Sequence, residues 1–203
     1  MKRIPSTITL TVVSLVTFLA AAGTSVADEQ MRLNARLHGD YAFTETDTCF
    51  IASGFDPTTF AVVPASGGGA PFMRVNQFGV SGIYRFNGDG TGTGTIRFLV
   101  IFASPPGTAI SETEGTCDLN YAVAPGGSVV LDRACTTNTT AGAGLGGINV
   151  GNIRESLQLT QGDRLALVGP TATPVVETIT NNGITSLPRI CARNGIVSKI
   201  SSR

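Results

Sequence analysis

Tight-turn signals at regular spacing constrain the fold of this chain more than any other feature. Asn87-Gly-Asp-Gly90 and Ala124-Pro-Gly-Gly127 each separate two runs of alternating apolar and polar residues. Glycine accepts the positive φ that such turns need, and proline fixes the first corner. Further turn signals follow at Gly162-Asp163, Asn182-Gly183 and Asn194-Gly195. This rhythm predicts about eight to ten short antiparallel strands.

The runs between the turns have the period of half-buried strands. Tyr41, Phe43 and Cys49 fall on one face at period two. No segment after residue 27 shows a sustained helical period, and residues 64–71 and 136–147 are predicted as loops. We therefore predict an all-β fold, an antiparallel meander that closes into a barrel, because closure removes exposed edge strands. A β-sandwich is the alternative.

The N-terminus has the layout of a secretory signal peptide. Met1-Lys2-Arg3 is basic, residues 8–22 are apolar, and Ser25-Val26-Ala27 places small residues before the acidic Asp28. An uncleaved anchor helix is the alternative, although a membrane span needs about 20 apolar residues. We predict cleavage after residue 27, a single barrel domain over residues 28–203, and a periplasmic or extracellular protein with no integral membrane association.

The four cysteines all lie in the predicted domain. Four cysteines in an exported chain predict two disulfides, with three possible pairings. One bulge residue at Gly127 places Cys117 opposite Cys135 across the second hairpin, which leaves Cys49 to pair with Cys191. A zinc site needs closely spaced cysteine pairs, and the sequence has none. We expect no metal.

Charge and motifs exclude several functions. Fourteen basic residues balance fourteen acidic ones, so we expect no nucleic-acid partner. Residues 142–147 match a dinucleotide fingerprint without the helix that it needs, and residues 87–92 resemble half of a calcium loop without its closing glutamate. His38 is the only histidine, and no nucleophile motif accompanies it. We expect no catalytic residue and no cofactor.

Two carboxylate pairs have a spacing that places both members on one face of a strand. These are Glu45 with Asp47 and Glu112 with Glu114. Paired carboxylates suit general acid–base chemistry. We expect instead that both pairs lie on a solvated, threonine-rich outer face.

An arginine-rich pair of strands is the candidate ligand site. Arg74, Arg85 and Arg97 flank the first hairpin turn, beside Tyr84. With Phe86 opposite Thr91, Arg85 and Arg97 are not direct partners, yet all three arginines can point to one side. Inside a barrel they would bind a carboxylate or phosphate in a bidentate manner, whereas on the outside they would shield apolar surface.

Gly39-Asp-Tyr41-Ala-Phe43, Cys49 and Phe86-Asn-Gly-Asp-Gly-Thr-Gly92 resemble segments of small secreted bacterial proteins with lipocalin- or calycin-type barrels. The resemblance implies that fold and assigns no site residues. Such a barrel can hold one small molecule, so we expect a protein that binds a small apolar or amphipathic ligand in its interior. A structural or cell-surface interaction module without a pocket, and a barrel isomerase or cyclase, are the alternatives. The sequence leaves the oligomeric state open.

Overall fold

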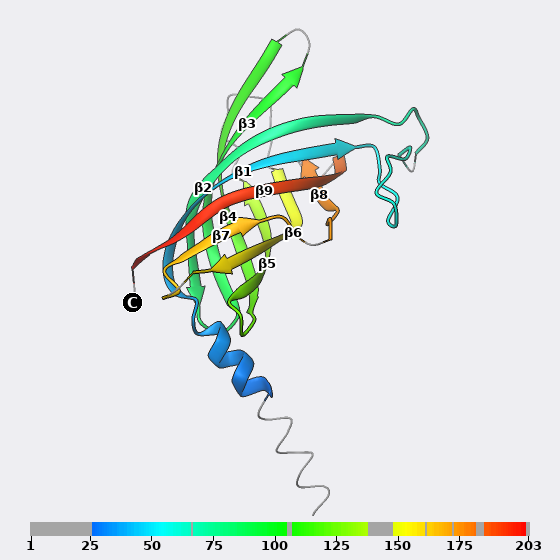
Figure 1. Cartoon of the computed structure of the whole chain (residues 1–203). Helices are drawn as coiled ribbons and strands as arrows, with labels where there is room; N and C mark the ends of the chain where they lie inside the picture. The colour runs from blue at the N-terminus through cyan, green and yellow to red at the C-terminus, as the bar shows by residue number, and fades with distance from the viewer. Residues whose placement is uncertain are drawn as a thin grey trace, which may run out of the picture.

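The computed structural model of the chain describes residues 26–65, 67–104, 107–137, 148–160, 162–171, 173–181 and 185–201. In these residues a short helix, residues 26–34, precedes nine strands (Figure 1). The strands are β1 His38–Ala52, β2 Met73–Asn87, β3 Thr91–Ser104, β4 Gly107–Val123, β5 Ser128–Thr137, β6 Ile148–Leu159, β7 Leu165–Gly169, β8 Glu177–Asn181 and β9 Thr185–Ser201.

The strands form a closed antiparallel barrel. Each strand from β1 to β6 pairs with the next along the chain, β7 pairs with β9, and β9, the last strand, pairs back onto β1 over most of its length. The short strands β7 and β8 share one place in the ring, because both lie between β6 and β9 at different heights. The ring therefore holds eight strands, which confirms the predicted all-β meander barrel and excludes the sandwich.

Alternate residues of each strand face the interior. Tyr41, Phe43 and Cys49 are buried as predicted. At the end of the barrel beside the helix, Tyr41, Phe86 and Tyr121 pack edge to face, and Leu37 is 1% exposed. The Tyr121 hydroxyl donates to the carbonyl of Leu37 at 2.9 Å, and the Val123 amide donates to Oδ1 of Asn34 at 3.0 Å. The helix end is thus tied to the barrel, and aromatic side chains fill this end.

The hairpin between β4 and β5 has the predicted register. Gly127 has a φ of +83°, and Cys117 faces Cys135 across the ladder. The two cysteines form a disulfide, as do Cys49 and Cys191, which join β1 to β9. Both predicted pairings are confirmed.

Two sequence predictions about turns were wrong. Phe86 pairs with Gly92 rather than Thr91, because the turn contains one more residue, with positive φ at both Gly88 and Gly90. Arg97 therefore faces Ser81. No turn forms at residues 194–195, where β9 continues and Gly195 pairs with Glu45. Glycine is needed there, because a Cβ atom at Gly195 would lie 2.4 Å from a carbonyl oxygen of β1.

The turn at Gly162-Asp163 is confirmed, since it joins β6 to β7 and both residues have positive φ. Asn182-Gly183 and most of the predicted loop over residues 136–147 lie outside the described residues.

Candidate functional site

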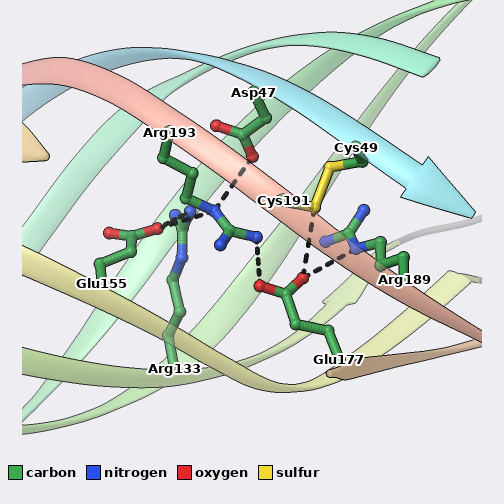
Figure 2. The surroundings of a disulfide bond; sticks show 8 residues. All are labelled: Asp47, Cys49, Arg133, Glu155, Glu177, Arg189, Cys191 and Arg193. Atoms are coloured by element: carbon green, nitrogen blue, oxygen red, sulfur yellow. Dashed lines mark hydrogen bonds and ion pairs between the residues drawn. A yellow bond between two sulfur atoms is a disulfide. The ribbon is translucent and has the colours of Figure 1, made fainter. Parts of the chain in front are cut away.

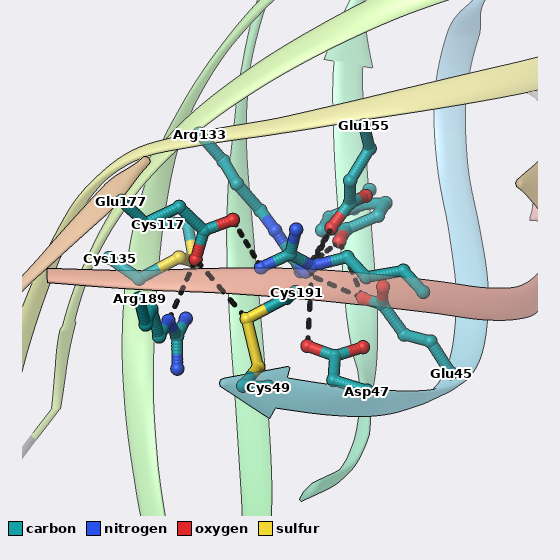
Figure 3. A network of polar contacts seen from close by, with 12 residues as sticks. Glu45, Asp47, Cys49, Cys117, Arg133, Cys135, Glu155, Glu177, Arg189 and Cys191 are labelled. Carbon is teal, nitrogen blue, oxygen red and sulfur yellow. Dashed lines mark hydrogen bonds and ion pairs between the residues drawn. A yellow bond between two sulfur atoms is a disulfide. The ribbon is translucent and has the colours of Figure 1, made fainter. Parts of the chain in front are cut away.

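A network of charged side chains lies inside the barrel (Figure 3). Along β1 its residues are farther from the helix than Tyr41, which belongs to the aromatic end. Each of the network's seven side chains is at most 4% exposed. They come from five strands: Glu45 and Asp47 from β1, Arg133 from β5, Glu155 from β6, Glu177 from β8, and Arg189 and Arg193 from β9. We call this set the charged network.

The expectation that Glu45 and Asp47 face solvent was wrong. Both carboxylates are buried, at 3% and 2% exposed, because they share the odd-numbered face of β1 with Phe43 and Cys49. The same signal was available for the arginines. Arg133 lies two residues from Cys135, and Arg189 and Arg193 lie two residues on either side of Cys191, so each shares the inward face of a bridged cysteine.

Arg133 connects one half of the charged network. Its Nη1 lies 2.8 Å from Oε1 of Glu45 and donates to the hydroxyl of Tyr84, while its Nη2 pairs with Oε1 of Glu155. The Tyr84 hydroxyl is also 3.3 Å from Oε1 of Glu45, and its ring stacks on Phe43 with centroids 3.9 Å apart. Tyr84 is therefore the member of the predicted arginine-rich ligand site that contacts the charged network in the described part of the chain.

Arg193 connects the other half (Figure 2). Its Nε lies 3.3 Å from Oδ2 of Asp47 and 3.5 Å from Oε1 of Glu155, and its Nη2 lies 2.5 Å from Oε1 of Glu177. The other oxygen of Glu177 accepts a 2.8 Å hydrogen bond from Nε of Arg189 and lies 3.7 Å from Sγ of Cys191. The ion pairs thus run without a break across the lumen and end beside a disulfide.

Part of the network occupies a seam in the barrel wall. β6 pairs with β8 through residues 148–151 and with β7 through residues 156–159, while β9 pairs with β8 through residues 185–189 and with β7 through residues 195–198. Among the described pairings, residues 152–155 of β6 and 190–194 of β9 have no partner strand on this side. Glu155 and Arg193 lie in these two stretches, so an ion pair between their side chains connects β6 and β9 at a level where the described residues form no backbone pairing.

The charged network offers hydrogen-bonding atoms that the described part of the chain does not use. Oε2 of Glu45, Oδ1 of Asp47, Oε2 of Glu155 and Nε of Arg133 are buried without a hydrogen bond or ion pair there. Buried polar atoms in proteins are almost always paired, and a buried ion pair often stabilises a fold less than apolar residues of the same volume. The network therefore contains buried polar atoms whose hydrogen-bonding capacity the described residues do not satisfy.

Burial shifts the proton affinities of the network. Desolvation raises the pKa of Asp47 to about 6, against the opposing attraction of Arg193, and it raises the pKa of Glu155 well above its ordinary value. Desolvation also raises the pKa of Tyr84 far above its ordinary value, so its hydroxyl stays protonated. For Arg133, burial lowers the pKa, but Glu155 and Glu45 outweigh it and the net shift is upward. The Arg133 guanidinium is therefore charged, and the pKa of Asp47 is about 6.

The other predicted site residues do not join the network. Arg85 and Arg97 lie on the outer face, where Arg85 pairs with Asp40 at 2.8 Å and Arg97 pairs with Glu112 and Glu114 at 3.0 and 3.1 Å. Arg74 is exposed at the start of β2. Arg97, Glu112 and Glu114 thus occupy the solvated face expected for the second carboxylate pair.

Arg85 also borders a shallow hollow of about 410 Å³ on the outside of β2, β3 and β4. The polar groups that line this hollow are mostly exposed threonine hydroxyls. Within the described ranges, no three His, Cys, Asp or Glu residues are placed to hold a metal ion, and no helix has the length and apolar character of a membrane span.

Comparisons with known proteins do not assign this chain to a family. Models of known protein families and curated protein sequences give no match. A solved structure, the S-type phycobiliprotein lyase CPES from Guillardia theta, aligns over 84% of this chain and 92% of its own, with 6% identity and a TM-score of 0.24. The protein is therefore classed by its own strand pairing, as a closed antiparallel barrel with a charged lumen. Its two disulfides indicate an oxidising, exported environment.

Proposed function

We propose that this barrel binds a small amphipathic molecule in its interior, with the polar end of the molecule at the charged network. The observation that supports the proposal is the set of buried network atoms without partners, three carboxylate oxygens and one guanidinium nitrogen. Leaving such atoms unpaired costs free energy, which a polar ligand would recover. An eight-stranded barrel is of the size that holds one small ligand.

The arrangement of the lumen favours an amphipathic ligand. Aromatic side chains fill the end beside the helix, so the ligand would lie between the network and the opposite end. Apolar side chains of Ile51 and Val150 are buried in strands toward that opposite end, and Phe78 is buried level with Asp47. They would contact the apolar part of the ligand.

The test combines detection of a ligand with a change that blocks the lumen. The purified protein is analysed by native mass spectrometry and organic extraction, and then titrated with the neutral fluorescent probe N-phenyl-1-naphthylamine. We expect one bound molecule per chain. Val150→Phe should abolish binding, because this side chain is 4% exposed and inward, whereas Val130→Phe on the outer face should leave it unchanged.

Near-ultraviolet circular dichroism shows whether each variant folds. A protein that releases no ligand and binds no probe would refute the proposal and support a structural module without a pocket. Binding that survives Val150→Phe in a folded variant would also refute it, because the molecule would then bind elsewhere.

We further infer that residues 1–27 direct export and are removed, leaving one barrel domain over residues 28–203. The two disulfides support this inference, because they form in oxidising compartments. Expression of the whole gene in a bacterium, followed by mass determination of the product, tests it. A product in the periplasm or medium that begins at Asp28 is expected, and an uncleaved product would refute it.

A further inference from the structure

The balance of charge in the network specifies the head group of the ligand, an inference that rests on the proposed function. The network has four carboxyl groups and three guanidinium groups, so it carries one excess negative charge when all are ionised. An uncompensated charge in a buried site is costly. We propose that a primary ammonium group on the ligand supplies the fourth positive charge, bound by the unpartnered oxygens of Glu45, Asp47 and Glu155.

The three oxygens belong to carboxylates that lie close together. Glu45 and Asp47 are two residues apart on the inner face of β1. Glu155 projects from β6 toward them, because it contacts Arg133, which pairs with Glu45, and Arg193, which pairs with Asp47 (Figure 3). Each of the three carboxylates thus has one oxygen in an ion pair and one oxygen that is unpartnered and buried.

The chemistry of a primary ammonium matches this set better than other head groups. An ammonium has three N–H donors and no acceptor, so it can satisfy three carboxylate oxygens at once. A quaternary ammonium carries the charge without donors. An anionic head would add to the excess negative charge, and the guanidinium groups that would bind it already pair with the network carboxylates.

A proton is the competing source of the fourth positive charge. The raised pKa values of Asp47 and Glu155 show that a proton binds there more readily than to an exposed carboxyl group. An ammonium ligand would displace that proton, whereas a ligand with a neutral head would leave it in place. The two cases differ in which head groups the barrel prefers.

The experiment compares head groups on one alkyl chain. The purified protein with both disulfides intact is titrated near neutral pH, by isothermal calorimetry, with n-octylamine, n-octanol, octanoate and octyltrimethylammonium. Charge-assisted hydrogen bonds predict that the amine binds at least about tenfold more tightly than the alcohol. The quaternary ammonium and the carboxylate should bind no more tightly than the alcohol.

Two variants test whether the charged network causes the preference for the amine over the alcohol. Asp47→Asn removes the excess charge with little change of shape, so the ratio of amine affinity to alcohol affinity should fall to about one in this variant. Glu112→Gln removes an exposed outer carboxylate and should change neither affinity. If Asp47→Asn fails to fold, the comparison of the four head groups on the unsubstituted protein still tests the ammonium site.

The outcomes separate this inference from the proposed function. Equal binding of amine and alcohol would overturn the ammonium site while the interior ligand site stands, and a proton would then neutralise the network. A preference for the amine that persists in folded Asp47→Asn would also overturn it. Binding of none of the four probes would remove support for both proposals.

Discussion

The buried carboxyl group of Asp47 makes the stability of the barrel depend on pH in an unusual direction. A carboxyl group in an ion pair normally has a lowered pKa in the folded state and stabilises the fold as pH rises. Burial instead raises the pKa of Asp47 from 3.8 to about 6. The folded state therefore binds a proton at Asp47 more tightly than the unfolded state does, so the contribution of this group to stability is fully present below pH about 4 and is lost as pH rises through about 6. Asp47→Asn removes this titration.

The size of this pH dependence follows from the shift in the pKa of Asp47. A difference of about 2 pKa units corresponds to about 3 kcal/mol in the free energy of unfolding. The charged groups that face Asp47 are the other members of the network, which come from β5, β6, β8 and β9 and from β1 itself. Glu155 also has a raised pKa, so it adds to the effect in the same direction.

Urea unfolding, followed by circular dichroism at a series of pH values between about 4 and 7 with both disulfides intact, measures the effect. The unsubstituted protein should lose stability as pH rises over this window, and Asp47→Asn should lose about 3 kcal/mol less. Glu112→Gln, which changes an exposed carboxylate, should keep the original slope. Equal slopes for the protein and Asp47→Asn would refute the reasoning, because Asp47 would then titrate like an exposed carboxyl group.

Three further predictions concern stability, each measured by urea unfolding against the unsubstituted protein. Replacing both cysteines of the β1–β9 disulfide, which spans 142 residues, with alanine should lower the free energy of unfolding by about 5 kcal/mol. The same change at the hairpin disulfide, which spans 18 residues, should lower it by about 3 kcal/mol. Equal losses in the two variants would contradict the loop-entropy model. Arg133→Met leaves the buried carboxylates of Glu45 and Glu155 without this partner and should lower the free energy of unfolding by about 3–5 kcal/mol. Arg97→Met, the control at an exposed ion pair, should lower it by less than about 1 kcal/mol. Similar losses in the two variants would show that water reaches the interior ion pairs. Gly195→Ala should lower the free energy of unfolding by about 1–3 kcal/mol, because the added Cβ would collide with the backbone of β1. Gly151→Ala, whose Cβ would point into open space, should be nearly neutral. A neutral Gly195→Ala would mean that β1 and β9 separate readily.

The sequence predicted the architecture well where local signals determine it. Turn residues and alternating apolar positions are properties of neighbouring residues, so the meander and the β4–β5 hairpin were correct. Knowledge of that register was enough to pair Cys117 with Cys135 and, by elimination, Cys49 with Cys191. The β2–β3 register was wrong by one residue, because Gly88 and Gly90 both adopt positive φ and lengthen the turn.

The site was missed because its residues are far apart in the sequence. A charged residue in a strand is expected to face solvent, and only pairing with distant charges makes burial tolerable. Arg133 has its partners on β1 and β6, which no local pattern reveals. The face shared by Glu45, Asp47 and Cys49 was visible in the sequence, and strict use of that alternation would have placed both carboxylates inside.

The seam between β6 and β9 makes the barrel unequal around its circumference. One disulfide joins β9 to β1 and the other joins β4 to β5, so neither disulfide connects β6 to β9 across the seam. Around residues 152–155 and 190–194 the described pairing leaves the two strands joined by ion pairs rather than by a ladder. High salt weakens such pairs only where water reaches them. We therefore expect the barrel to open first at this level, with both disulfides and most of the strand pairing intact. Amide hydrogen exchange along these two stretches that is faster than along the paired parts of β6 and β9 would be the measurement of that opening.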